Sequence, residues 1–472
     1  MSESMRAKAT PMTLSQKGFR ALFGKQMAAF EGLPGPTPSL PAGNALELLR
    51  RPIWEVLAKY GERYGELSVM WLLGSPTLVV SSPELIWQVL EGDFANYYKK
   101  SPRKELLPLI TDAAELIANG EAWATRRASD PVLLAHDPQQ LRALDAGAIR
   151  QAIGQRMRSY VEETRHAPFS DVMPRVMRVA FDVLAIQAVG RVLGQELFEA
   201  YMTLAQVGHD RLMSPVTLPF ALTPGAAARS LWQSTFESLV QEGKRSPDRV
   251  GGILRAALRA GSPVDERTLA TRIGNIFLGG LAPFTSGVIS TLSLLTQHPD
   301  VGERVSAEAR VADARLAGEG IQVLDEYPEL DRAVLEALRL LAPVPIYSRR
   351  TLATKEVTLG GHVLPPDTNI YISCWGLHRS ATHWENPERY DPSRWLNGVK
   401  EANPMGSGYF FPFGRGRRAC ASGPLGLLNI KWVVASILAT CRPELGAGQT
   451  YAPTLFFGAL FPQAMKARFL PR

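Results

Sequence analysis

The sequence predicts a mainly α-helical protein with small β-sheets, an α+β fold, and three observations support this fold class. Apolar residues recur with a helical period over about residues 139–298, interrupted by Pro215, Pro219 and Pro224. Short runs rich in β-formers alternate with turns over 343–372. No low-complexity linker, charge block or internal repeat divides the chain. One large domain with a dominant helical layer is therefore expected.

Composition indicates a globular protein from a reducing compartment. The 472 residues are 46% hydrophobic, which is ample for a core. Three scattered cysteines, Cys374, Cys420 and Cys441, form no disulfide framework, so we expect a cytoplasmic location. The net charge of +7 is spread along the chain, and no nucleic-acid-binding motif accompanies it. A nucleic-acid partner is therefore not expected.

Residues 1–32 read as a leader that is flexible or forms an amphipathic helix, and residues 33–472 as a single catalytic domain. A transit peptide is a further alternative, weakened by the low serine content. No apolar run in this leader approaches the ~20 residues of a membrane span, so we expect no transmembrane anchor there. The domain opens on the proline-rich stretch 33–41, and β-formers over 67–72 and 76–80 predict a hairpin.

The chemistry of the chain concentrates in residues 411–426, around Cys420. Gly414 and Gly416 precede the cysteine and allow a tight turn. An apolar segment that reads as a helix follows it, and three arginines surround it: Arg415, Arg417 and Arg418. Cations and a helix N-terminus both favour the thiolate form of a cysteine, which is the form that binds metals. Taken alone, a cysteine is more often a small buried hydrophobe.

The spacing Phe413-Gly-x-Gly-x-Arg418-x-Cys420 resembles the haem-binding loop of the cytochrome P450 family. The resemblance implies that Cys420 ligates the iron of haem b, that Arg418 binds a haem propionate and that Phe413 packs against the sulfur. It also implies the P450 fold, a triangular helical prism around a buried haem. One departure is visible, because the family usually has glycine two residues after the cysteine and this chain has Ser422.

Two further segments follow the family pattern for propionate binding. Trp123 and Arg127 lie four residues apart, on one face of an expected helix. Alone they would be a boundary tryptophan and a solvated arginine; the resemblance makes them a second clamp on the haem. From the β-rich region, Arg349 or Arg350 is expected to reach a propionate. We prefer Arg350, with a register uncertain by one residue.

The long apolar segment from about Val264 to His298 resembles the family's central helix, which carries an acid–threonine pair over the iron. We align the threonine of that box with Thr285 and assign it the catalytic role. The acid is then replaced by Phe284, which has no titratable group. Gly279, Gly280 and Pro283 interrupt the segment and predict a kink or a widened turn.

A folding clamp is expected from Glu336 and Arg339, spaced like the family's E-x-x-R motif. The best match for their downstream arginine is Arg394. Without the resemblance, the pair would be a surface ion pair that contributes about 0–1 kcal/mol.

The family resemblance implies a monooxygenase that takes dioxygen, electrons from a separate ferredoxin or flavodoxin with its reductase, and a hydrophobic small molecule. A basic docking face for an acidic donor is expected from the arginines of 415–418 with Lys431 and from Arg126 with Arg127. The missing acid leaves an alternative open: a peroxide-using or non-redox haem-thiolate enzyme, such as a peroxygenase or isomerase. A haem protein without turnover is a third. Candidate pocket residues are apolar apart from Tyr97 and Tyr98: Leu106, Leu107, Ile110, Leu281, Phe284, Val344, Ile346, Phe456 and Phe457.

Overall fold

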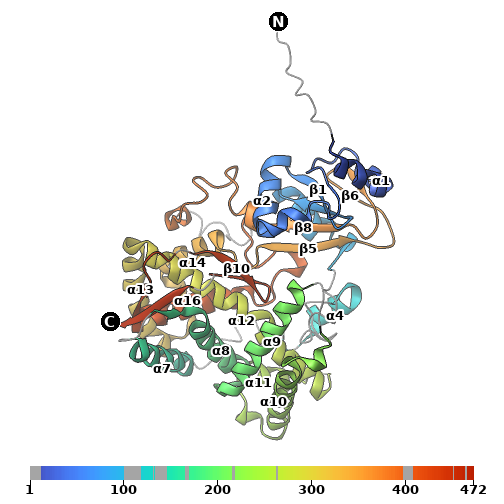
Figure 1. The fold of residues 1–472 in the computed structure, drawn as a ribbon. Coiled ribbons are helices and arrows are strands. Elements are labelled where there is room, and N and C mark those ends of the chain that lie inside the picture. Colours follow the sequence, from blue (N-terminus) through green and yellow to red (C-terminus); the bar gives the residue numbers. More distant parts are fainter. Residues whose placement is uncertain are drawn as a thin grey trace. The chain divides into compact units, whose positions relative to one another are not determined.

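The computed structural model describes residues 12–99, 118–130, 132, 146–164, 169–214, 218–261, 264–396, 408–449, 451–462 and 465–472 (Figure 1). The chain forms two compact units. The smaller comprises residues 1–98 and 346–385, and the larger residues 99–345 and 386–472. The fold class is mainly helical with several small sheets, as the sequence predicts. A single catalytic domain over 33–472 stays a prediction.

The smaller unit is built on a five-stranded sheet of order β1-β2-β8-β5-β3. Its strands are β1 (Leu67–Leu72), β2 (Ser75–Val80), β8 (Asn369–Ser373), β5 (Ile346–Thr351) and β3 (Tyr97–Tyr98). The predicted hairpin is confirmed, because β1 and β2 pair antiparallel from Leu67 opposite Val80. Strand β2 pairs with β8 in parallel, with Thr77 opposite Asn369. The sheet therefore joins two segments that are far apart in sequence.

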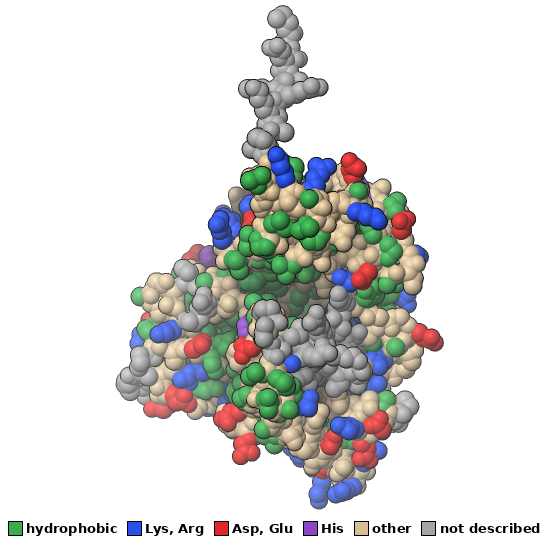
Figure 2. Space-filling model, turned by 45° about the vertical axis from the view of Figure 1, so that its right-hand side comes forward, with side chains coloured by type: hydrophobic (Ala, Val, Ile, Leu, Met, Phe, Trp, Pro, Cys, Tyr) green, Lys and Arg blue, Asp and Glu red, His purple; other side chains and the backbone are tan. Residues whose placement is uncertain are grey.

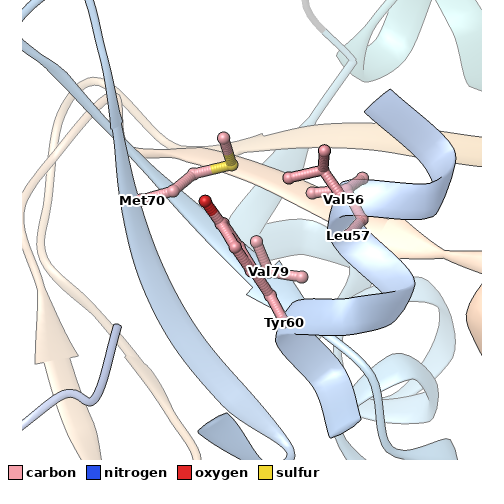
Figure 3. Close-up of a cluster of buried hydrophobic side chains, with 5 residues drawn as sticks. All are labelled: Val56, Leu57, Tyr60, Met70 and Val79. Atoms are coloured by element: carbon pink, nitrogen blue, oxygen red, sulfur yellow. The ribbon is translucent and has the colours of Figure 1, made fainter. Parts of the chain in front are cut away.

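Helices α1 (Leu14–Ala28), α2 (Ile53–Tyr64), α3 (Pro83–Trp87) and α15 (Cys374–Leu377) complete the smaller unit, together with the hairpin of β6 (Val357–Leu359) and β7 (His362–Leu364). Helix α2 lies on the sheet through apolar side chains of its inner face. Val56, Leu57 and Tyr60 of α2 pack on Met70 of β1 and Val79 of β2 (Figure 3). All five are at most 2% exposed, so this cluster fixes α2 on the first hairpin.

The larger unit carries most of the helices. They are α4 (Gly120–Ser129), α7 (Ala146–Thr164), α8 (Val172–Val189), α9 (Gln195–Met213), α10 (Gly225–Arg245), α11 (Gly252–Arg259), α12 (Glu266–Gln297), α13 (Pro299–Glu319), α14 (Pro328–Leu340) and α16 (Gly423–Thr440). Its strands form two small sheets, β4 (Ser170–Asp171), β12 (Lys466–Pro471) and β9 (Cys441–Leu445), and β10 (Pro453–Phe456) with β11 (Ala459–Pro462).

Helix α12 is the core helix of the larger unit, in contact with α8, α10, α14 and α16 (Figure 1). Asp265 caps its N-terminus by accepting a hydrogen bond from the Thr268 backbone. The helix continues through Pro283, and the predicted kink stays a prediction. Within the described residues, α12 and α16 are long and apolar enough to span a membrane, but both are largely buried in the protein. Long apolar helices of this kind also occur in the core of globular proteins.

The predicted clamp around Glu336 is confirmed. Glu336 and Arg339 on α14 are fully buried and bonded through two contacts, of 3.0 Å from Nε to Oε2 and 2.9 Å from Nη2 to Oε1. Arg394 donates from Nε to Oε1 at 2.8 Å. Trp395 Nε1 donates to Oε2 at 3.0 Å, and the Asp391 backbone donates to Oε1 at 3.0 Å. The carboxylate thus fastens α14 to the segment that precedes the cysteine loop.

We expect Glu336→Gln to lower the free energy of unfolding by about 3–5 kcal/mol, because it leaves the buried Arg339 without its counter-charge. The measurement is urea denaturation. The control is Glu163→Gln, whose carboxylate is half exposed and pairs with Arg175 at 2.7 Å; this substitution should cost about 0–1 kcal/mol. Equal losses in the two variants would contradict a structural role specific to the buried carboxylate.

Candidate functional site

The cysteine loop turns back on itself immediately before α16. The Cys420 amide donates to the Phe413 carbonyl at 2.8 Å, which closes the loop. Gly414 and Gly416 have φ of 76° and 73°, a backbone conformation that favours glycine. Helix α16 begins at Gly423, three residues after the cysteine. The loop therefore presents Cys420, which is exposed and in no disulfide, close to a helix N-terminus.

The Phe413 ring lies against the first turn of α16. A Cβ on Gly426 would come within 3.1 Å of the ring, and a Cβ on Gly423 within 3.4 Å of the Phe413 Cβ. A side chain at Gly426 would require the ring to shift slightly, whereas the distance at Gly423 is an ordinary contact. The close approach of the ring to α16 thus falls on Gly426.

Helix α4 is joined to the loop by its predicted arginine. Arg127 Nη2 donates to the carbonyl of Ala419, the residue before the cysteine, at 2.9 Å. Trp123, one turn earlier, is buried at 3% exposure. The structure thus brings together α4 and Cys420, which lie about 290 residues apart in sequence.

Arg418 makes the second link between the loop and α4. Its Cζ lies 4.6 Å from the centroid of the Trp123 ring, within range of a cation–π interaction. Its Nη2 donates to the Ala118 carbonyl at 2.7 Å and to Asn119 Oδ1 at 3.0 Å. Five of the predicted site residues therefore share one region of the larger unit: Trp123, Arg127, Phe413, Arg418 and Cys420.

The residues present fit a haem with a thiolate ligand. Cys420 is exposed next to cationic side chains, whereas Cys374 and Cys441 are buried, and burial raises the pKa of both thiols, that of Cys441 to about 12. A guanidinium has five N–H donors, so a bond from one nitrogen of Arg127 or Arg418 is compatible with binding a carboxylate through another. The described residues contain no cluster of three or more His, Cys, Asp or Glu that would hold a different metal site.

The central helix places Thr285 in the protein interior. Its side chain is fully buried, and its hydroxyl donates to the Leu281 carbonyl one turn earlier at 2.8 Å. Phe284 is 6% exposed, and Ser286 is also buried with its hydroxyl on the Leu460 carbonyl. The hydroxyl hydrogen of each alcohol is thus held by a protein carbonyl. A catalytic role for Thr285 stays a prediction.

Arg350 lies in the smaller unit, on β5, with partners of its own. Its guanidinium pairs with Asp367, and its Nε donates to Asn369 Oδ1 at 2.6 Å. Tyr98 also donates to Asp367. Two of its nitrogens are thus engaged within the smaller unit, and its assignment to a propionate stays a prediction. Arg349 is buried on the opposite face of the strand.

One predicted surface group is wrong, and one contact was missed. Lys431 is 3% exposed and pairs with Asp325 and Asp331, both at 2.8 Å, so it belongs to no exposed docking face.

The missed contact joins Arg272 of α12 to Asp130 at the end of α4, at 3.0 Å between Nη1 and Oδ2. No local sequence signal marks either pairing, since both depend on helices distant in sequence.

The pocket candidates are only partly described. Leu106, Leu107 and Ile110 lie outside the described residues. Phe456 and Phe457 are half-buried at the turn of the β10–β11 hairpin. The Phe456 ring lies 5.5 Å from that of His209 on α9, and burial lowers the pKa of this histidine. The turn of this hairpin thus packs on α9 through both phenylalanines, since the Phe457 ring lies beside Gly208.

Comparison with known proteins gives a consistent result. The family model described as Cytochrome P450 matches residues 33–464. The chain is 28% identical to a cyclooctat-9-en-7-ol 5-monooxygenase of Streptomyces melanosporofaciens, over 88% of this chain and 90% of that protein. It is 27% identical to a cyclooctatin synthase of the same organism, over 87% and 89%. It is 23% identical to a dolabradiene monooxygenase of Zea mays, over 88% and 87%.

We expect Trp123 and Arg418 to be energetically coupled. In a double-mutant cycle of Trp123→Leu and Arg418→Leu, the coupling energy should be about 0.5–1 kcal/mol, because the ring and the cation stabilise each other. Urea unfolding of the four proteins measures it. A parallel cycle with the exposed neighbour, Arg417→Leu, should give a coupling near zero. The same coupling in both cycles would show that the effect is not the ring–cation contact.

Proposed function

Because the chain belongs to the cytochrome P450 family, a haem-thiolate monooxygenase family with relatives in secondary metabolism, we propose that it inserts one oxygen atom of dioxygen into a hydrophobic small molecule. The observation that carries the proposal is the double link between α4 and the cysteine loop. Arg127 binds the Ala419 carbonyl and Arg418 lies on Trp123, and Cys420 is exposed between these contacts and α16.

The proposed division of roles follows from these contacts. Cys420 is the iron ligand, and a thiolate ligand supplies electron density that favours O–O bond cleavage when the haem is bound. Arg127 and Arg418 bind the two propionates, while hydrogen bonds from their side chains to backbone carbonyls hold α4 against the loop. Phe413 shields the sulfur, with its ring packed against Gly426 in the first turn of α16. The protein thus provides a fixed ligand and two fixed cations.

The substrate we propose is an apolar ring-containing alkene or alkenol. The apolar pocket candidates Phe456 and Phe457 support an apolar substrate body. The names of two relatives, which give cyclooctat-9-en-7-ol and dolabradiene as substrates, support the class. A screen of such compounds against the haem-loaded protein, read by the shift of the Soret band, tests the proposal. Binding restricted to charged or small polar compounds would contradict it.

A second candidate, a peroxide-using or non-redox haem-thiolate enzyme, is favoured by one observation. Residues 281–286 of α12 contain no titratable side chain, and both alcohols there donate to protein carbonyls. Substrate-dependent NADPH consumption with a surrogate reductase supports the monooxygenase. Peroxide-supported turnover without a reductase supports the alternative.

For the electron donor we propose a small acidic ferredoxin or flavodoxin with its reductase, and a cytoplasmic location. Arg417 is exposed on the cysteine loop and Arg126 half-buried on α4, which gives a basic edge beside Cys420. On the face drawn in Figure 2, Lys and Arg side chains are interspersed with Asp and Glu. A local basic edge, rather than the net charge, would therefore direct docking.

We expect the reduced protein with carbon monoxide to show the red-shifted Soret band of a thiolate ligand, and Cys420→Ala to abolish it. Cys374→Ala and Cys441→Ala are the matched controls, since both thiols are buried, and each should retain the band. Loss of the band in either control with retention in Cys420→Ala would assign the ligand elsewhere.

We expect electron transfer from an acidic donor to slow as salt rises from 0.05 to about 0.5 M, because the Debye length then shortens to a few ångströms. Stopped-flow reduction measures the rate. Arg417→Glu should lower the rate at low salt and flatten the salt dependence. Arg259→Glu, on α11 and 66% exposed, should change neither. An identical effect of both variants would rule out docking at the cysteine loop.

A further inference from the structure

One strip in the middle of the central helix is open, whereas most residues of α12 from Leu281 to Leu295 are buried. Gly279 is exposed, and Ile276, Gly280 and Pro283 are half-buried. Among the described residues, a Cβ added to Gly279 would meet no atom within 4 Å, and one added to Gly280 would meet only Leu184, at 3.9 Å. The helical period places these four residues on one face. The strip therefore borders space that the described side chains of the larger unit do not fill.

The contacts on either side of the strip show what it faces. Before it, Arg272 binds Asp130 at the end of α4, the helix that binds the loop through Arg127. After it, Gly287 packs on α16, where an added Cβ would lie 2.6 Å from Ile430 Cδ1. Because α4 and α16 flank Cys420, the strip between these two contacts lies toward the Cys420 site.

Thr285 lies on the other side of the same helix. Each residue of an α-helix turns by about 100°, so Thr285 is rotated by about 200° from Pro283. Its full burial agrees with this position. The residue that reaches the strip at this level is thus Pro283, which has neither a hydroxyl nor an amide hydrogen.

The strip nevertheless carries one acceptor and one donor. Pro283 cannot donate to the carbonyl four residues earlier, so the Gly279 carbonyl lacks its usual helical partner. One turn before Gly279, the Asn275 Nδ2 is buried and has no hydrogen-bond partner among the described residues. A buried amide without a partner is rare in native proteins and indicates a site for a ligand or water.

We propose that Asn275 and the Gly279 carbonyl form a binding site for a hydroxyl group of the substrate, on the face of α12 toward the cofactor. The hydroxyl oxygen accepts from the Asn275 amide, and its hydrogen donates to the Gly279 carbonyl. The apolar body of the substrate lies along Ile276 and the Pro283 ring. Thr285 then has a structural role, and the substrate hydroxyl supplies the polar group that this helix face, which has no acid or alcohol, lacks.

This inference rests on one part of the proposed function, the binding of a haem at Cys420. The first experiment tests which face of α12 borders the cofactor, with 4-phenylimidazole as an iron-binding probe of the haem-loaded protein. Its dissociation constant, read from the Soret shift, should rise at least tenfold in Gly279→Leu and less in Gly279→Ala, in step with the added volume. Thr285→Val, which keeps the volume, should stay within twofold. A larger effect in Thr285→Val than in both glycine variants would overturn the proposal.

The second experiment tests the hydroxyl site with a matched pair of probes, 4-phenylimidazole and 4-(2-hydroxyphenyl)imidazole. The native protein should prefer the hydroxylated probe by about 2- to 10-fold, the effect of one net hydrogen bond. Pro283→Ala restores the amide that binds the Gly279 carbonyl, and Asn275→Ala removes the donor. Each should reduce the preference, while Thr285→Val should preserve it. An unchanged preference in both strip variants, or none in the native protein, would refute the site.

The two proposals fail in different ways. If Cys420→Ala retains the carbon monoxide band, the proposed function fails before any probe is added. If that band depends on Cys420 but the probes respond to Thr285 and not to Gly279, only the assignment of the strip fails.

Discussion

The side chain of Glu336 is fully buried, and a carboxylate is stable there only where hydrogen-bond donors replace water. Arg339 on the same helix supplies two donors, and Arg394, Trp395 and the Asp391 amide supply the others. The donors come from two segments, so the carboxylate is satisfied only when α14 and residues 391–395 have met. This requirement fixes the start of the segment that leads to the cysteine loop.

From that fixed segment the chain reaches a loop whose geometry is set by its own backbone and by α4. Two glycines with positive φ and the bond between Cys420 and Phe413 define the turn. Arg127 and Arg418 then attach it to α4 through a carbonyl and an aromatic ring. The same two cations are suited to a dianionic cofactor, so they combine attachment of the loop with recognition of the ligand.

The sequence alone was sufficient to predict structure where a short motif determines its own backbone geometry. The turn at Gly414 and Gly416, the placement of Trp123 and Arg127 on one helix, and the pairing of Glu336 with Arg339 were predicted correctly because each depends only on a helix turn or a short loop. Lys431 was misplaced because a basic residue on an apolar helix gives no sign of the two aspartates that neutralise it.

The central helix shows a second limit. A run rich in apolar residues on all sides predicts burial but leaves open which face borders the site. For α12, the face was visible only from packing: Gly287 on Ile430, Arg272 with Asp130, and the open space at Gly279. Aligning the family's threonine with Pro283 instead of Thr285 shifts the motif by two residues. Two residues turn an α-helix by about 200°, so the two alignments place opposite faces of α12 toward the site.

The five-stranded sheet has a consequence for synthesis. Strand β2 is complete early in translation, but its parallel neighbour β8 is made about 290 residues later, which at 5–20 residues per second is roughly 15–60 s. Throughout that interval the nascent chain carries the apolar edge of Leu78–Val80 without its native partner. An unpaired edge of this kind invites intermolecular pairing. Yield of the folded enzyme in a heterologous host should thus depend on ribosome-associated chaperones and on translation speed between β2 and β8.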